Sequence, residues 1–208
     1  MTADDIDPSE TTLEEWLDRL AEPHGAPGGG AACGVMTAIA AALLGMVASY
    51  TPDEPRARDA VRRLHEHRRA ATEAAEDDGV RSAAFGAALA MDESPERERA
   101  IREATVEAIR SSLAIGVIAA SLVGEARRLA EVSNPHVEAD LKVALGALGA
   151  ALDGVLVTAR SDLATLTKHD DAGGSVGSSI RQQESTVAEV ASARDSLRRL
   201  VAERTQRE

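Results

Sequence analysis

Apolar residues recur along this chain three or four positions apart, which is the spacing of helices rather than strands. Near the N-terminus, Thr12 and Glu15 have the spacing of a capping box, in which each side chain bonds the other residue's backbone N–H. The apolar stripe that follows consists of Leu13, Trp16, Leu17 and Leu20. This pattern predicts a short amphipathic helix that begins just after Thr12.

The next apolar segment, residues 30–50, contains no charged residue at all. It is long enough to cross a bilayer. However, it is rich in alanine and glycine, and its flanks lack the Lys/Arg excess and the aromatic belt of a membrane span. We interpret it as a buried central helix, with a membrane helix as the alternative. Its small residues Gly34, Ala38, Ala41 and Gly45 fall close enough in phase for another helix to approach.

Prolines and glycines set the expected limits of the remaining helices. Ser94-Pro95 is a start signal, Asn134-Pro135 is a stop signal, and Gly79 is interpreted as a break. The helices predicted in this way are 55–77, 80–91, 95–132, 136–168 and 178–204. The expected fold is therefore an all-α, single-domain antiparallel bundle of six to seven helices, with an extra C-terminal helix.

Composition supports a closely packed helical bundle. Hydrophobic residues make up 44% of the 208 residues but aromatic residues only 1%, so alanine supplies much of the core. We divide the chain into a frayed N-terminus (1–11), a helical domain (12–169), and a loop with the C-terminal helix (170–208). The net charge of −12 argues against nucleic-acid binding. We expect a cytoplasmic protein that binds no membrane, because no signal peptide is recognisable.

The loop Pro27-Gly28-Gly29-Gly30 opens the uncharged helix. Glycines at a helix N-terminus expose backbone N–H groups at the positive end of the helix dipole, which suits an anion. The same glycines would equally form a tight turn between two packed helices. His24 lies in the same loop and is a candidate acid or base.

The sequence resembles the formiminotetrahydrofolate cyclodeaminase and methenyltetrahydrofolate cyclohydrolase family. The residues that carry the resemblance are the glycine loop, Met46-Val47, Thr51, Asn134-Pro135 and Asp140, within roughly residues 12–168. The resemblance implies an all-α homodimer that binds a tetrahydrofolate derivative without a metal. The resemblance makes Asp140 the expected catalytic residue, although an acid in the first turn of a helix would also be stabilised there by the helix dipole. His24 of the glycine loop is the second expected acid or base, with an ordinary loop residue as the alternative.

The chain departs from the family pattern in its middle and late parts. Where the family has an acidic residue four positions before a Phe-Asn pair, this chain has Arg81, followed by Phe85-Gly86. The nearby acids Asp77 and Asp78 would take that place only if the turn shifted in register. Where the family has an Asn-Val-x-x-Asn pattern, the chain has Thr158 and Asp162, which share a helix face and would either hold a polar substrate group or simply face solvent. The predicted substrate-binding residues are Pro27, Gly28, Gly29, Gly30, Arg81, Thr158 and Asp162.

Three functions follow from these observations. The first is a cyclodeaminase or cyclohydrolase-like enzyme that closes or cleaves a C–N bond of a one-carbon tetrahydrofolate derivative. The second is a repurposed member that catalyses C–N ring closure or elimination on a non-folate substrate. The third is a non-catalytic helical dimer that binds a ligand or partner.

Overall fold

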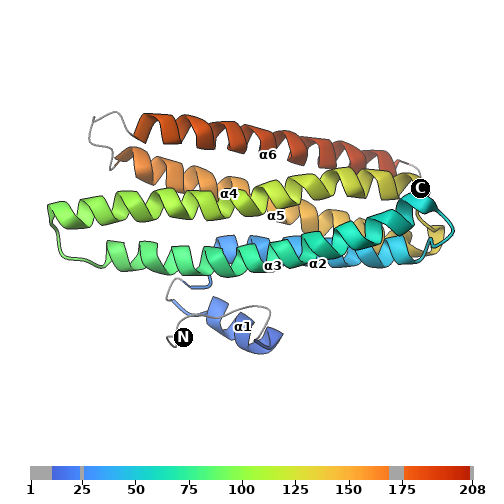
Figure 1. Cartoon of the computed structure of the whole chain (residues 1–208), viewed down its shortest axis with the longest axis horizontal. Coiled ribbons are helices and arrows are strands. Elements are labelled where there is room, and N and C mark those ends of the chain that lie inside the picture. Colours follow the sequence, from blue (N-terminus) through green and yellow to red (C-terminus); the bar gives the residue numbers. More distant parts are fainter. Residues whose placement is uncertain (1–10, 24–25, 169–175, 207–208) are drawn as a thin grey trace.

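The computed structural model describes residues 11–23, 26–168 and 176–206, with the side chains of 176–180 left aside. Within these ranges the chain is entirely helical and contains no strand (Figure 1). The predicted fold class is confirmed. The elements are α1 (Leu13–Leu20), α2 (Gly29–Ser49), α3 (Pro55–Leu89), α4 (Pro95–Val132), the short 3₁₀ helix η1 (Pro135–Val137), α5 (Glu138–Lys168) and α6 (Val176–Thr205).

The helix start signals behave as the sequence predicts. The capping box of α1 is formed, with the N–H of Glu15 bonded to Thr12 Oγ1 and the N–H of Thr12 bonded to the Glu15 carboxylate. Ser94 caps α4 by accepting the N–H of Arg97. Asn134 accepts the N–H of His136 at the turn that leads into α5.

The predicted break at Gly79 is wrong, because α3 runs through it without interruption. A glycine inside a helix costs only about 1 kcal/mol relative to alanine. The buried face of α3 continues across this position, with Ala71, Ala75 and Asp78 before it and Ala88 after it. Packing of that face outweighs the glycine penalty.

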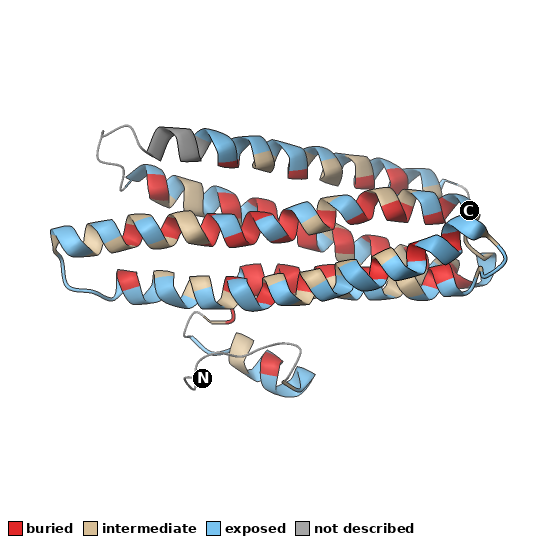
Figure 2. Cartoon of the chain, viewed as in Figure 1, coloured by how far each residue is buried: buried red, intermediate tan, exposed pale blue. Residues whose placement is uncertain are grey.

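Five long helices form the bundle, and α1 lies outside it (Figure 1). The helix α2 packs against α3, α4 and α5, while α6 packs along α4 and α5. Buried residues follow the inward faces of the long helices (Figure 2). On α2, Gly34 lies against Ala71 and Ala75 of α3, where an added Cβ would collide with the Ala75 backbone. The small-residue face of α2 therefore admits α3 of the same chain.

The C-terminal helix α6 packs on the bundle along its length. Val190, Leu197 and Leu200 are buried against it. Arg198 pairs with Asp153, and Arg204 pairs with Glu138, both on α5. The C-terminal helix is therefore part of the bundle.

Three helices, α2, α4 and α5 with its preceding turn, are long and apolar enough to cross a membrane by length and composition. Between 44% and 56% of each apolar window is buried within the bundle. About half of the residues in these apolar windows are therefore buried by packing against other helices of the bundle.

Candidate functional site

The N-terminus of α2 is capped by a carboxylate from another helix. Its N-cap residue, Gly28, has no side chain to bond the first N–H groups. Instead, the N–H of Ala31 bonds to Asp78 of α3, whose side chain is only 3% exposed. A Cβ added at Gly30 would overlap the Asp78 carboxylate. Glycine is required at this position because the Asp78 side chain lies directly on the backbone.

Two hydroxyl groups complete the surroundings of Asp78. Ser111 Oγ of α4 donates to Asp78 Oδ1 at 2.8 Å, and Ser82 Oγ lies 3.4 Å from Asp78 Oδ2. Burial raises the pKa of Asp78 above its ordinary value, and the bonds from Ser111, Ser82 and the Ala31 N–H oppose that rise. Asp78 is thus a buried carboxylate whose charged form is stabilised by specific donors.

Helix α5 brings a hydroxyl and a second carboxylate to the same place. Thr158 Oγ1 lies 2.7 Å from Ser112 Oγ of α4, and the Thr158 methyl group lies 3.8 Å from a Cβ built on Gly29. One turn later, Asp162 is half-buried. Burial first, and then the charge of Asp78, raise the pKa of Asp162 to about 6. Asp162 has no bonding partner among the described residues.

These residues meet at the end of α2, not along its side. Because Gly30 contacts Asp78 and Gly29 faces Thr158, the first turn of α2 lies beside an interior part of α3 and α5, not beside their ends. The helices α3, α4 and α5 run on past that turn (Figure 1). Asp162 lies one turn beyond Thr158, on a part of α5 along which α2 does not extend.

The arrangement suits proton transfer. Two carboxylates close enough for one charge to affect the other titrate as a pair, and one of them holds a proton near pH 6. A group with a pKa near the working pH is an efficient general acid and base. The anion at the helix N-terminus, which the sequence left as a possible ligand site, is the protein's own Asp78.

The buried Cys33 of α2 adjoins this cluster. Burial first, and then the charge of Asp78, raise its pKa to about 11, so it is a neutral thiol at physiological pH. A Cβ added at Gly154 of α5 would lie 2.5 Å from its sulfur atom. Cys33 therefore fills a tight contact between α2 and α5.

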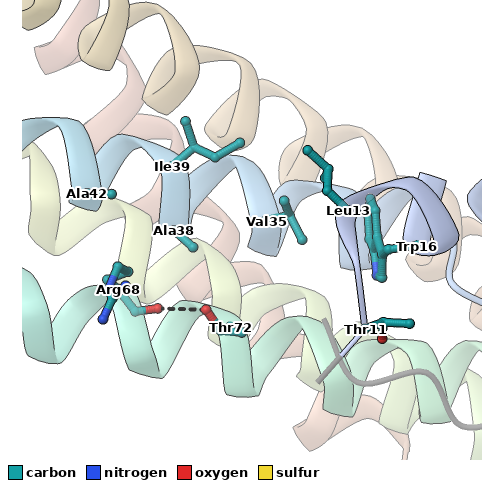
Figure 3. A pocket seen from close by; sticks show the side chains of 9 residues that line it. All are labelled: Thr11, Leu13, Trp16, Val35, Ala38, Ile39, Ala42, Arg68 and Thr72. Atoms are coloured by element: carbon teal, nitrogen blue, oxygen red, sulfur yellow. Dashed lines mark hydrogen bonds between the residues drawn. The ribbon is translucent and has the colours of Figure 1, made fainter. Parts of the chain in front are cut away.

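A separate groove of about 390 Å³ lies between α1, α2 and α3 (Figure 3). Leu13 and Trp16 line it from α1, and Val35 and Ile39 line it from α2. Its α3 wall is polar, with Thr72 Oγ1 donating to the carbonyl oxygen of Arg68. The lining contains no carboxylate, so this groove lacks the proton-transfer groups found at the end of α2.

Comparison with known proteins decides the family. The model of the family described as formiminotransferase-cyclodeaminase matches residues 12–173. The chain belongs to this family. No curated protein sequence matches it.

Among solved structures, the chain is similar to the formiminotetrahydrofolate cyclodeaminase of Thermotoga maritima, with a TM-score of 0.75 and 21% identity. The match covers 93% of this chain and 97% of the other, and at this identity it shows a shared fold. The uncovered 7% is about 15 residues, fewer than the 30 residues of α6. The shared fold of this cyclodeaminase-family chain therefore includes at least part of α6.

Several of the predicted site residues do come together in this family member. Gly28, Gly29 and Gly30 form the first turn of α2, with the buried Pro27 just before it. Thr158 faces this turn from α5, and Asp162 lies one turn further along α5, where the charge of Asp78 helps to raise its pKa. His24 lies outside the described residues.

Asp140 does not belong to this cluster. It lies in the first turn of α5, 18 residues before Thr158, which corresponds to about 27 Å along a helix. At that end of the bundle, the N–H of Asn134 bonds Thr51 Oγ1 and its side-chain amide bonds the carbonyl oxygen of Tyr50. The Asn-Pro segment thus ties two helix turns together, far from the glycine loop.

Arg81 also lies apart from the two carboxylates of the cluster, Asp78 and Asp162. It bonds Asp77 of its own helix and Glu107 of α4, and it lines a shallow groove between the ends of α3 and α4. The acidic residue that α3 presents to the glycine loop is Asp78. The predicted site residues did not include Ser111 and Ser112, and they included Arg81 in place of Asp78, although Asp78 continues the helical spacing of Ala71 and Ala75.

Proposed function

We propose that this chain closes or opens a C–N bond in a one-carbon derivative of tetrahydrofolate, as a cyclodeaminase or cyclohydrolase. Membership of the formiminotransferase-cyclodeaminase family supports the substrate class. The observation that carries the chemistry is the half-buried Asp162 beside Asp78 at the N-terminus of α2, with its pKa raised to about 6.

The reaction needs one proton moved between two nitrogens. The attacking nitrogen adds to the one-carbon unit and loses a proton, which gives a tetrahedral carbon. The leaving nitrogen must then gain a proton to depart as ammonia. Asp162 is suited to both steps, because a carboxyl group with a pKa of about 6 accepts and returns a proton at similar cost. In ring opening, water adds to the one-carbon unit and loses a proton, and the ring nitrogen that departs from the tetrahedral carbon gains one.

The test is the absorbance change of methenyltetrahydrofolate, with formiminotetrahydrofolate as the second substrate. We expect Asp162→Asn to lower kcat by 10²–10⁴-fold, roughly the contribution of general acid–base catalysis, although asparagine is the residue that the family resemblance leads us to expect at this position. Asp140→Asn is the matched control on the same helix and should retain near-normal turnover. Full activity of Asp162→Asn, or loss of activity in Asp140→Asn alone, would contradict the assignment.

A specific observation favours the repurposed enzyme as the second candidate. Thr158 bonds Ser112, and Asp162 presents a carboxylate, at the two positions where the family resemblance leads us to expect amides. A carboxylate accepts hydrogen bonds where an amide also donates them, so the preferred substrate group changes. Absence of turnover and of thermal stabilisation with reduced folates would favour a non-folate substrate or the non-catalytic alternative.

We further propose that the chain is a cytoplasmic homodimer that associates through the outer faces of α2 and α5. The helix α2 carries no charge, and Ile39 and Tyr50 are exposed on it. On α5, Val143 and Val157 are 61% and 68% exposed. An apolar face that spans two neighbouring helices is typical of a surface buried in an assembly. A second copy of the chain is the proposed occupant.

A further inference from the structure

We infer that the two carboxylates of the site have fixed and different roles. Asp78 is held as an anion by α2 and Ser111 over the pH range in which Asp162 exchanges the proton, and Asp162 is the residue that exchanges it. Ser111 is then a positioning residue that acts through Asp78. The catalytic meaning of this division rests on the proposed function, whereas the order of protonation does not.

The hydrogen bonds of Asp78 favour its charged form. It accepts the N–H of Ala31 at the positive end of the α2 dipole, and it accepts the hydroxyl of Ser111 at 2.8 Å. The Ser111 hydroxyl also lies 3.0 Å from the carbonyl oxygen of Ala108. The carboxylate is the stronger acceptor because it is charged and closer. Protonation of Asp78 would weaken these bonds.

Asp162 has none of these donors. No described residue bonds its carboxylate, and Asp78 is the one described charged group that shifts its pKa. The other groups that face the pair are Cys33 of α2, which is a neutral thiol, the hydroxyls of α4, and Asp77 of α3, which forms an ion pair with Arg81. The first proton that the pair takes up therefore goes to Asp162.

This order has an asymmetric consequence. When Asp162 titrates, Asp78 is charged, so replacing Asp78 by asparagine removes a repulsion and lowers the midpoint of Asp162. When Asp78 titrates at lower pH, Asp162 is already neutral, so Asp162→Asn leaves the Asp78 midpoint nearly unchanged. If Asp78 took the first proton, the two variants would behave in the opposite way.

The experiment is a pH titration of the full chain labelled with ¹³C at the aspartate carboxyl carbons, observed by NMR. In the wild type we expect the Asp162 midpoint at about 6 and the Asp78 midpoint below it. Asp162→Asn should move the Asp78 midpoint by less than about 0.3 pH units, a small fraction of the shift a close charge produces. A larger fall of the Asp78 midpoint in that variant would overturn the order.

Ser111→Ala tests the positioning role. Loss of one hydrogen bond to a charged group should raise the Asp78 midpoint by about one pH unit. Thr105→Ala is the matched control, because among the described residues this buried α4 hydroxyl bonds only the carbonyl oxygen of Ile101, so its loss should leave both midpoints in place. An unchanged Asp78 midpoint in Ser111→Ala would refute the role of Ser111. If Ser111→Ala does not fold, the wild-type and Asp162→Asn titrations still decide the order.

These titrations need no substrate. A chain that fails to turn over folates but shows this order refutes the proposed function alone. A chain that turns over folates but titrates in the reverse order refutes only the division of roles.

Discussion

Asp162→Asn should make the protein more stable at neutral pH, although it removes the proposed catalytic group. The pKa of Asp162 is raised from the ordinary aspartate value of 3.8 to about 6 in the folded chain. A carboxyl group with a raised pKa favours folding when protonated. Its contribution to stability is therefore fully present below about pH 4 and is lost as the pH rises through about 6.

The size of the effect follows from the shift. A change of about two pKa units corresponds to roughly 3 kcal/mol at most. Because Asp162 is only half-buried, solvent screening reduces this to about 1–2 kcal/mol. For a domain of this length, that gain raises Tm by about 2–8 °C at pH 7.5.

The assay is thermal or urea unfolding of wild type and variant at pH 7.5 and again below pH 4. Asparagine has the same shape and no charge, so the gain should be present at pH 7.5 and absent below pH 4. Asp153→Asn is the control on the same helix, because it breaks an exposed ion pair with Arg198 and should cost about 0–1 kcal/mol. A stabilisation equal at both pH values, or a loss of stability at pH 7.5, would refute the reasoning.

Two further predictions concern packing and assembly. Gly30→Ala should cost about 2–4 kcal/mol in the free energy of unfolding, because its Cβ displaces the buried Asp78 carboxylate. Gly79 lies within the continuous helix α3, and a Cβ added there meets open space. Gly79→Ala should therefore stabilise the chain by about 0.5–1 kcal/mol. Val143→Arg should convert the dimer to a folded monomer in detergent-free light scattering, whereas Val201→Arg on the exposed side of α6 should not. A monomeric wild type, or one recovered only in membranes, would contradict the proposed assembly.

Local signals in the sequence predicted most of the fold. The capping box at Thr12 and the Ser94-Pro95 start determine helix ends through bonds between residues three positions apart, so no knowledge of the tertiary structure is needed. Gly79 misled the prediction because its cost is small and the packing that outweighs it comes from distant helices. Hydrogen bonds within one segment can be predicted from that segment alone. Whether packing against distant helices outweighs a local preference cannot.

The candidate site was only partly predictable for the same reason. The glycine loop, Thr158 and Asp162 were identified from motifs and spacing, and they do meet. Asp140 was placed with them because its segment matched the family, yet the length of α5 puts it near the opposite end of the bundle. Asp78 was passed over because the family pattern puts the expected acid at the position of Arg81, and Asp78 would take its place only with a shift in register.

The position of Asp78 also changes what the glycine loop can recognise. A free helix N-terminus attracts a phosphate or carboxylate, because its N–H groups and dipole are unsatisfied. Here the N–H of Ala31 is bonded to Asp78, and a second acid, Asp162, lies nearby. An anionic group brought to this place would meet a negative charge where the bare loop would have offered a positive one. The part of a substrate that contacts these carboxylates is therefore expected to be a hydrogen-bond donor, such as a protonated nitrogen, and any anionic part must lie elsewhere.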